Sequence, residues 1–329
     1  MKLRVGDLVE VRSEAEILAT LDEKGELDNL PFMPEMLRYS GRRLTVHKVA
    51  HKTCDTITRT GLRRMDDTVH LLEARCDGSG HGGCQTACLL YWKEAWLKKV
   101  DPAEPTVERA REPRLLPLLE VNTRKEPGPG GGERFSCQAT ELLRAAPRSL
   151  PLKSPGQFVT DVRSGNASVG RAVYGVLVAL YNRYQGLSRR LLPAWLHIRG
   201  GLPWGGVRGT VTGRTPVELL DLRPGELVRI KPKEKILATV NEELLNRGMS
   251  FNEEMARHCG RTARVRARVE RCVDEATGRM LEMKTACIVL DNVACTGMDL
   301  LNCPRGFYPF WREIWLERVE EPVPAEESA

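Results

Sequence analysis

Residues 6–20 read GDLVEVRSEAEILAT, and residues 225–239 read GELVRIKPKEKILAT. The string ILAT is identical in the two stretches, which are related by one constant offset, the repeat offset, that takes Gly6 to Gly225. The same offset relates WKEAWL at residues 92–97 to WREIWL at residues 311–316. Self-similarity at a fixed offset is the signature of a repeated unit. We therefore predict that one domain of about 100 residues is present twice.

Between the two copies, the composition changes twice. A stretch rich in proline, glycine and charge cannot bury a core and is typical of a linker. It is followed by ASVGRAVYGVLVALYNRYQ, whose apolar residues have helical spacing. We predict, in chain order, repeat A (1–100), a flexible Pro/Gly linker (101–134), a helical middle domain (135–219), repeat B (220–320) and an acidic tail (321–329).

Within each repeat, the pattern favours β-structure. Asp7–Arg12 alternates apolar and polar residues after a glycine, and so does Arg43–Val49. Pro34–Tyr39 is a short helical piece that Gly41 ends. We predict an α+β fold class, in which two homologous β-rich SH3-like barrel domains flank a small helical domain. An unrelated α+β fold is the rival interpretation, because short apolar runs do not establish barrel closure.

The overall composition excludes several classes of protein. The chain has 329 residues, of which 41% are hydrophobic and 29% charged, a balance typical of globular proteins. A net charge of +6 is too small for a protein that coats nucleic acid in general. No apolar run approaches the roughly 20 residues of a membrane span, and the N-terminus does not resemble a signal peptide. We expect a cytoplasmic protein with no membrane partner.

Cysteine is the most informative residue type. Nine of the ten cysteines fall in the repeats, and Cys76 and Cys84 match Cys295 and Cys303 at the repeat offset. The segment CDGSGHGGCQTAC (76–88) is rich in glycine, which lets backbone amides turn toward thiolates. Thiolates are the ligands of zinc and of iron–sulfur clusters. We predict a Cys-ligated metal in each repeat.

The ligands follow from the positions shared by the two copies. For repeat A we predict Cys54, Cys76, Cys84 and Cys88, with His81 as a substitute. For repeat B we predict Cys272, Cys287, Cys295 and Cys303, with Cys259 as the alternative to Cys287. Zinc is the expected metal, and an iron–sulfur cluster is the alternative, favoured by the proline that follows Cys303. The absence of any metal is the third possibility, since free cysteine is also an ordinary core residue.

Two further groups are candidate binding residues. Trp92 and Trp96 lie at positions i and i+4, as do Trp311 and Trp315, so each pair would share a helix face. Such a face would stack on a base or a sugar, whereas the competing interpretation is a set of core residues. Arg264, Arg266 and Arg268 alternate with apolar residues and would form a positive strand face that meets phosphates. The competing interpretation of that face is a solvated surface with acidic partners.

Several strings resemble a family of uncharacterised bacterial proteins. They lie in the last two thirds of the chain, where they read DVRSGN (161–166), ALYNRYQ (179–185), SRRLLP (188–193), PGELVR (224–229) and YPFWREIWLERV (308–319). Repeat A is a more diverged relative, in which Ser40 stands opposite Cys259. The resemblance implies no activity, and it implies association with bacterial biosynthetic or glycosyl-transfer genes.

Taken together, the residues predict a metal-binding, non-catalytic binding or scaffold protein whose partner is a protein or a carrier peptide. An iron–sulfur redox protein or accessory enzyme of a biosynthetic pathway is the alternative, and a nucleic-acid-binding protein is a further one. The sequence contains no nucleophile elbow, Walker loop, GxGxxG or HExxH motif. Whether the protein is an enzyme, and in what oligomeric state it exists, is left open by the sequence.

Overall fold

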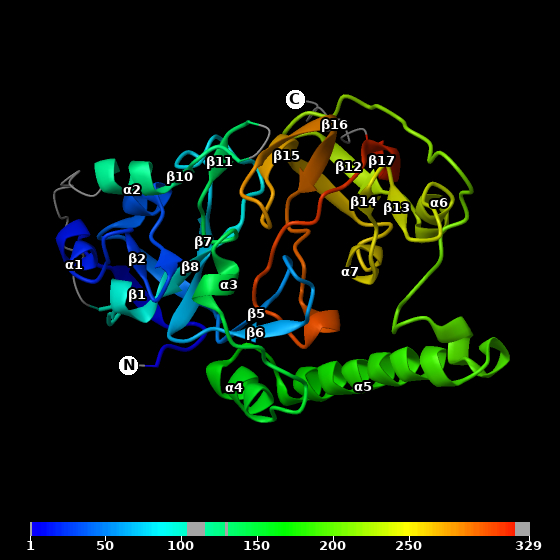
Figure 1. The fold of residues 1–329 in the computed structure, drawn as a ribbon, viewed down its shortest axis with the longest axis horizontal. Helices are drawn as coiled ribbons and strands as arrows, with labels where there is room; N and C mark the ends of the chain where they lie inside the picture. The colour runs from blue at the N-terminus through cyan, green and yellow to red at the C-terminus, as the bar shows by residue number, and fades with distance from the viewer. Residues whose placement is uncertain (1, 104–115, 129–130, 320–329) are drawn as a thin grey trace, which may run out of the picture.

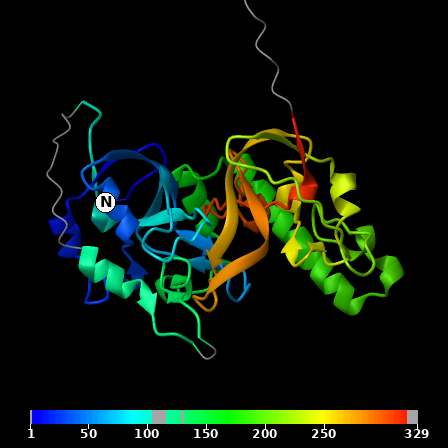
Figure 2. The same ribbon diagram turned by 90° about the horizontal axis from the view of Figure 1, so that it is seen from above.

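The computed structural model describes residues 2–103, 116–128 and 131–319, so the predicted acidic tail lies outside the described residues. The fold is mixed, with two curled, half-barrel antiparallel sheets side by side and helices below them (Figures 1 and 2). Within the described ranges, no helix has the length and apolar composition needed to cross a membrane.

Repeat A builds the first sheet, with the strand order β8-β7-β4-β1-β9. A capping box explains the start of its first helix. The Ser13 hydroxyl oxygen accepts a hydrogen bond from the Glu16 amide, and the Glu16 carboxylate accepts one from the Ser13 amide. The elements are β1 (Leu8–Val11), α1 (Glu14–Leu18), β2 (Glu26–Leu27), β3 (Leu30–Pro31), η1 (Pro34–Tyr39), β4 (Arg43–Val49), β5 (Lys52–Cys54), β6 (Leu62–Arg64), β7 (Thr68–Arg75), β8 (Leu89–Lys93), η2 (Glu94–Trp96) and β9 (Leu97–Lys99).

Repeat B builds the second sheet, with the strand order β16-β15-β12-β17. Its strands β15 and β16 form a long hairpin, which reaches back toward repeat A (Figure 1). The elements are β12 (Leu227–Ile230), α6 (Lys233–Leu237), β13 (Leu245–Asn246), β14 (Met249–Ser250), α7 (Glu253–Ala256), β15 (Thr262–Val273), β16 (Met280–Leu290), η5 (Met298–Leu300), η6 (Glu313–Trp315) and β17 (Leu316–Arg318).

The two sheets have the same strand pairing at the repeat offset. Val9 is paired with Leu44 on one side and Lys99 on the other. The corresponding Val228 is paired with Ala263 and Arg318, which are the residues that the offset predicts. Even the irregularity in register recurs, between residues 46 and 48 of β4 and between residues 265 and 267 of β15. Both copies therefore share one topology, down to individual residue pairs.

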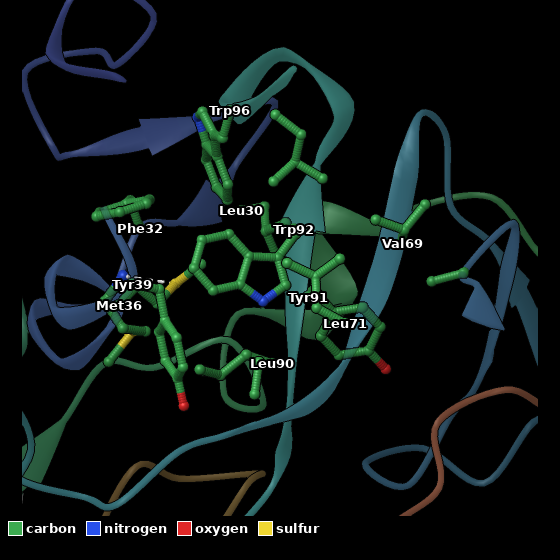
Figure 3. Packing of buried hydrophobic residues seen from close by; sticks show 14 of the residues in the cluster. Leu30, Phe32, Met36, Tyr39, Val69, Leu71, Leu90, Tyr91, Trp92 and Trp96 are labelled. Carbon is green, nitrogen blue, oxygen red and sulfur yellow. Dashed lines mark hydrogen bonds between the residues drawn. The ribbon is translucent and has the colours of Figure 1, made fainter. Parts of the chain in front are cut away.

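Tryptophans form the centre of each core, and Figure 3 shows those of repeat A, Trp92 and Trp96. Trp92, Trp96, Trp311 and Trp315 are all fully buried. The Trp96 indole N–H donates to the Thr20 hydroxyl at 3.1 Å, and Trp315 makes the same bond to Thr239 at 2.9 Å. A stacking role requires an open ring face, so these tryptophans match the competing interpretation, a set of core residues, and not the candidate binding face.

One part of the middle of the chain packs into repeat A, and the other part forms a pair of helices beneath the repeats. It contains α2 (Leu116–Asn122), β10 (Arg124–Lys125), β11 (Arg134–Phe135), α3 (Leu142–Ala145), α4 (Gly156–Ser164), α5 (Val169–Leu191), η3 (Ala194–Leu196) and η4 (Ile198–Gly201). Leu119 and Leu142 pack in the core of repeat A, so the helices α2 and α3 join that repeat instead of a separate domain. Helix α2 falls in the predicted linker, of which residues 104–115 and 129–130 lie outside the described ones. Helices α4 and α5 lie together beneath the repeats (Figure 1).

The two repeats meet through equivalent contacts. The Cys54 amide of repeat A donates to Cys303 Sγ of repeat B at 3.2 Å. At the repeat offset, the Val273 amide of repeat B donates to Cys84 Sγ of repeat A at 3.3 Å. Reciprocal contacts between the same two surfaces are the property of an isologous interface, such as that of a two-fold dimer. The two repeats are thus related in this contact as two subunits of a symmetric dimer would be.

Candidate metal centre

A single loop positions most of the candidate ligands. Residues 76–88 connect β7 to β8, and the loop closes at its base where the Cys76 amide donates to the Cys88 carbonyl at 2.8 Å. Gly78 has φ +74°, and a Cβ there would lie 2.1 Å from the Cys84 carbonyl oxygen. Glycine is therefore required, because the loop folds back tightly on itself at this point.

The loop brings three different ligand types together. Cys76, His81 and Glu35, which lies in η1, place their ligand atoms within 4.8 Å of one another. Cys76 Sγ lies 3.0 Å from a carboxylate oxygen of Glu35 and 3.6 Å from His81 Nε2. Two tetrahedral zinc ligands, one sulfur and one nitrogen, are about 3.6 Å apart when the bonds are about 2.3 and 2.1 Å long. The separation of Cys76 and His81 fits a shared ion.

Two polar atoms in this group are buried without a hydrogen-bond partner. They are Glu35 Oε2 and His81 Nδ1, on side chains that are 5% and 2% exposed. Buried polar atoms are nearly always satisfied, so an orphaned carboxylate oxygen and imidazole nitrogen side by side indicate a missing partner. A cation bound by Glu35 and by one ring nitrogen of His81 would give these two side chains the partner that they lack.

The remaining loop cysteines line the same small cavity. This cavity, of about 40 Å³, is bordered by Cys84 and Cys88 in addition to the three ligand candidates, and by Cys137. The turn between β15 and β16 of repeat B also reaches it, through Val273 and Glu275. The site therefore lies where the loop of repeat A contacts repeat B.

Electrostatics distinguish the thiols. Burial raises the pKa of Cys76, and the neighbouring Glu35 carboxylate raises it further. Burial also raises the pKa of Cys84, but hydrogen bonds from His81 and Thr86 outweigh it and lower that pKa to about 7. Burial lowers the pKa of His81, whereas Cys84 and Glu35 raise it, with a net increase. The contact between Cys84 and His81 thus lowers the pKa of the thiol and raises that of the imidazole, and metal binding would displace a proton from either ligand.

The matching loop of repeat B provides an internal comparison. Gly297 and Cys303 repeat the tight contact of Gly78 and Cys84, with a Cβ-to-carbonyl separation of 2.1 Å in both. However, Leu300 occupies the position of His81, and Phe307 that of Cys88. Glu254, the counterpart of Glu35, accepts the Met298 amide at 2.9 Å together with the Thr296 hydroxyl. Repeat B therefore lacks two of the candidate ligands, and its glutamate is satisfied by the loop itself.

The structure separates the other predicted ligands from this site. Cys54 does not join the loop cysteines of its own repeat; its amide contacts Cys303, with Leu62 beside the two cysteines. Cys272 and Cys287 do not line the cavity; they belong to an apolar cluster with Val269 and Phe135, which Cys84 also joins. Among the described residues, the side chains of Glu35, Cys76 and His81 converge closely enough to share one ion, and all three belong to repeat A.

The ligand set predicted from the sequence omits Glu35, although a signal for it is present. Glu35 and Glu254 match at the repeat offset, whereas the histidine is present in one copy. A carboxylate present in both repeats, with a histidine in the loop of one of them, indicates a site that is present once.

The predicted arginine face is occupied by acidic partners. Arg266 pairs with Asp291 at 3.1 Å, and Arg268 with Glu313 at 2.7 Å. Arg264 donates to the Gly225 carbonyl at 2.9 Å. These contacts match the competing interpretation, a solvated strand face, and they leave the nucleic-acid alternative without a supporting observation.

Comparison of the sequence with protein-family models, with curated proteins and with solved structures finds no match in any of the three.

Proposed function

We propose that this chain is a zinc-binding, non-catalytic scaffold protein that holds one ion in the loop of repeat A. The observation that carries the proposal is the pair of orphaned atoms on Glu35 and His81 beside Cys76. The same loop in repeat B, where leucine replaces the histidine, does not require a cation, because Glu254 accepts hydrogen bonds from the loop itself. We also infer that the repeats are homologous and of the SH3-like kind, which their common register supports.

The donor set favours a structural ion. Glu35, Cys76 and His81, with Cys84 or Cys88 as a fourth ligand, complete a tetrahedron and leave no open position for a substrate. A closed site stabilises the fold, since its binding free energy is available only to the folded loop. Because this loop contacts the turn of repeat B, the ion would hold the two repeats in their relative position. A protein or a carrier peptide remains the class of partner that we propose for such a scaffold.

The size of the cavity favours a single ion over an iron–sulfur cluster. A volume of about 40 Å³ corresponds to a few water molecules at about 10–15 Å³ each. A cluster is held by about four cysteine thiolates; four cysteines line the cavity, but Cys76 alone of them belongs to the convergent group, whose other members are a carboxylate and an imidazole.

A pair of matched variants tests the proposal. Cys76→Ser removes a ligand, whereas Cys295→Ser makes the same change at the equivalent position of repeat B. Elemental analysis of anaerobically purified protein should find about one zinc per chain in the wild type and in Cys295→Ser, and much less in Cys76→Ser. Equal zinc contents in the two variants would refute the assignment to repeat A, and iron with sulfide in the wild type would favour the cluster.

A further inference from the structure

Helix α5 exposes a continuous apolar stripe. Its residues are spaced by four, three, four, three and four positions, so they share one helix face: Val173, Leu177, Leu180, Tyr184, Leu187 and Leu191. Each of them is exposed, with Leu177 at 60% and Leu191 at 70%. The opposite face, which includes Gly175 and Val178, is buried. The stripe therefore points away from the rest of the protein.

The apolar surface extends beyond the helix at both ends. Val159 and Val162 of α4 are exposed at one end, where they line a groove between α4 and α5. Leu192 and Trp195 are exposed at the other, and Trp195 is 81% exposed. Helices α4 and α5 form the lower edge of the molecule (Figure 1). The stripe alone has the spacing of a coiled-coil seam, and the exposed residues of α4 and of the segment after α5 widen the apolar surface beyond one; we call the whole surface the α4–α5 face.

The chain segment that carries most of this face is rich in arginine. Residues 162–217 contain eight arginines and no aspartate, glutamate or lysine. Within the described part of the chain, none of these arginines pairs with a carboxylate. Arg183, Arg189 and Arg190 are exposed on α5 itself. The partner of the face must therefore carry negative charge beside apolar material.

A phospholipid bilayer with anionic headgroups has this combination. Helices with arginine beside an apolar face that includes tryptophan and leucine lie in the plane of the membrane interface. Arginine suits phosphate because its planar guanidinium donates two parallel hydrogen bonds. A second copy of the chain fits less well, since it would bring the same arginines against one another. We propose that the α4–α5 face binds an anionic membrane surface peripherally.

Vesicle co-sedimentation of the full-length protein tests the proposal. The protein should bind vesicles of phosphatidylcholine with phosphatidylserine and not vesicles of phosphatidylcholine alone, and binding should weaken as salt screens the charges. The double variant Arg189→Gln/Arg190→Gln should weaken partitioning about 25-fold, at about fivefold for each arginine.

A second double variant isolates the apolar contribution. Leu187→Ser/Trp195→Ser should reduce binding at least about tenfold. Val121→Ser on α2 is the matched control, because Val121 is 71% exposed but lies outside the α4–α5 face. Absence of binding to the anionic vesicles at low salt, or equal binding by the second double variant and the control, would overturn the proposal. So would a dimer that Leu187→Ser/Trp195→Ser dissociates, since the face would then join two copies of the chain.

Discussion

Replacement of His81 by leucine should abolish the loss of stability that metal removal causes in the wild type. The variant copies repeat B, which has Leu300 at the equivalent position of the same loop, so the loop accommodates leucine. His81 is 2% exposed, and its Nδ1 atom has no hydrogen-bond partner in the protein. A buried unsatisfied polar atom costs about 1–3 kcal/mol, a cost that leucine does not have.

The change that His81→Leu makes in the free energy of unfolding should have opposite signs without and with zinc. Without metal, His81→Leu should leave the free energy of unfolding unchanged or raise it by about 1 kcal/mol. With free zinc at about 1,000 times its dissociation constant, the wild type gains about 4 kcal/mol that the variant lacks. Addition of a chelator should therefore lower the free energy of unfolding of the wild type and leave that of His81→Leu unchanged.

Chemical denaturation with and without chelator, combined with the zinc content of each protein, measures this directly. His258→Leu is the matched control, since His258 is a buried histidine of repeat B, 5% exposed, whose Nε2 likewise has no hydrogen-bond partner. The control should keep its zinc and its response to chelator. The reasoning is refuted if His81→Leu retains a full zinc equivalent, or if chelation removes zinc from the wild type without lowering its stability.

Two further predictions concern the loop and the dependence on pH. Gly78→Ala and Gly297→Ala should each destabilise the fold by about 3 kcal/mol or more, because the new Cβ meets a carbonyl oxygen. Gly78→Ala should also lose zinc, whereas Gly297→Ala should keep it. Equal zinc contents in the two variants would contradict this prediction. Burial raises the pKa of Glu141, but hydrogen bonds from Lys125 and Arg144 outweigh it and lower that pKa to about 2 from its ordinary 4.5. A carboxylate whose pKa is lowered by folding stabilises the folded state above its unfolded-state pKa, and this stabilisation is lost as the pH falls through its folded-state pKa. Glu141→Gln should therefore lose less stability than the wild type between about pH 5 and pH 2, as measured by denaturation at each pH. Equal losses of stability in the two proteins would exclude this role of Glu141.

Several features of the fold can be predicted from local patterns. The offset that relates GDLVEV to GELVRI also relates the strand pairs, because a repeated pattern of apolar residues and turns specifies a repeated register. The helix predicted over residues 167–185 is present within α5. The glycine-rich segment is predicted as a ligand loop from its composition, and Cys76 and His81 within it converge.

Other features depend on contacts between segments far apart in sequence. The sequence predicts that Cys54 lies with the loop cysteines of repeat A, yet its amide contacts Cys303, because each repeat reaches the cysteine loop of the other. The middle segment is predicted to form its own domain, yet Leu142 completes the core of repeat A.

The sequence by itself therefore indicated the repeated unit, its β-rich character and the loop in which candidate ligands gather. These features depend on local periodicity, on glycine at tight turns and on residue type, which each stretch of chain carries independently of the others. The tertiary structure alone decided that Glu35 joins Cys76 and His81, that the tryptophans are buried and that the stripe on α5 is left uncovered. The physical reason is that burial and ligand convergence depend on which non-local surfaces pack together, and a single periodic pattern is compatible with several such packings.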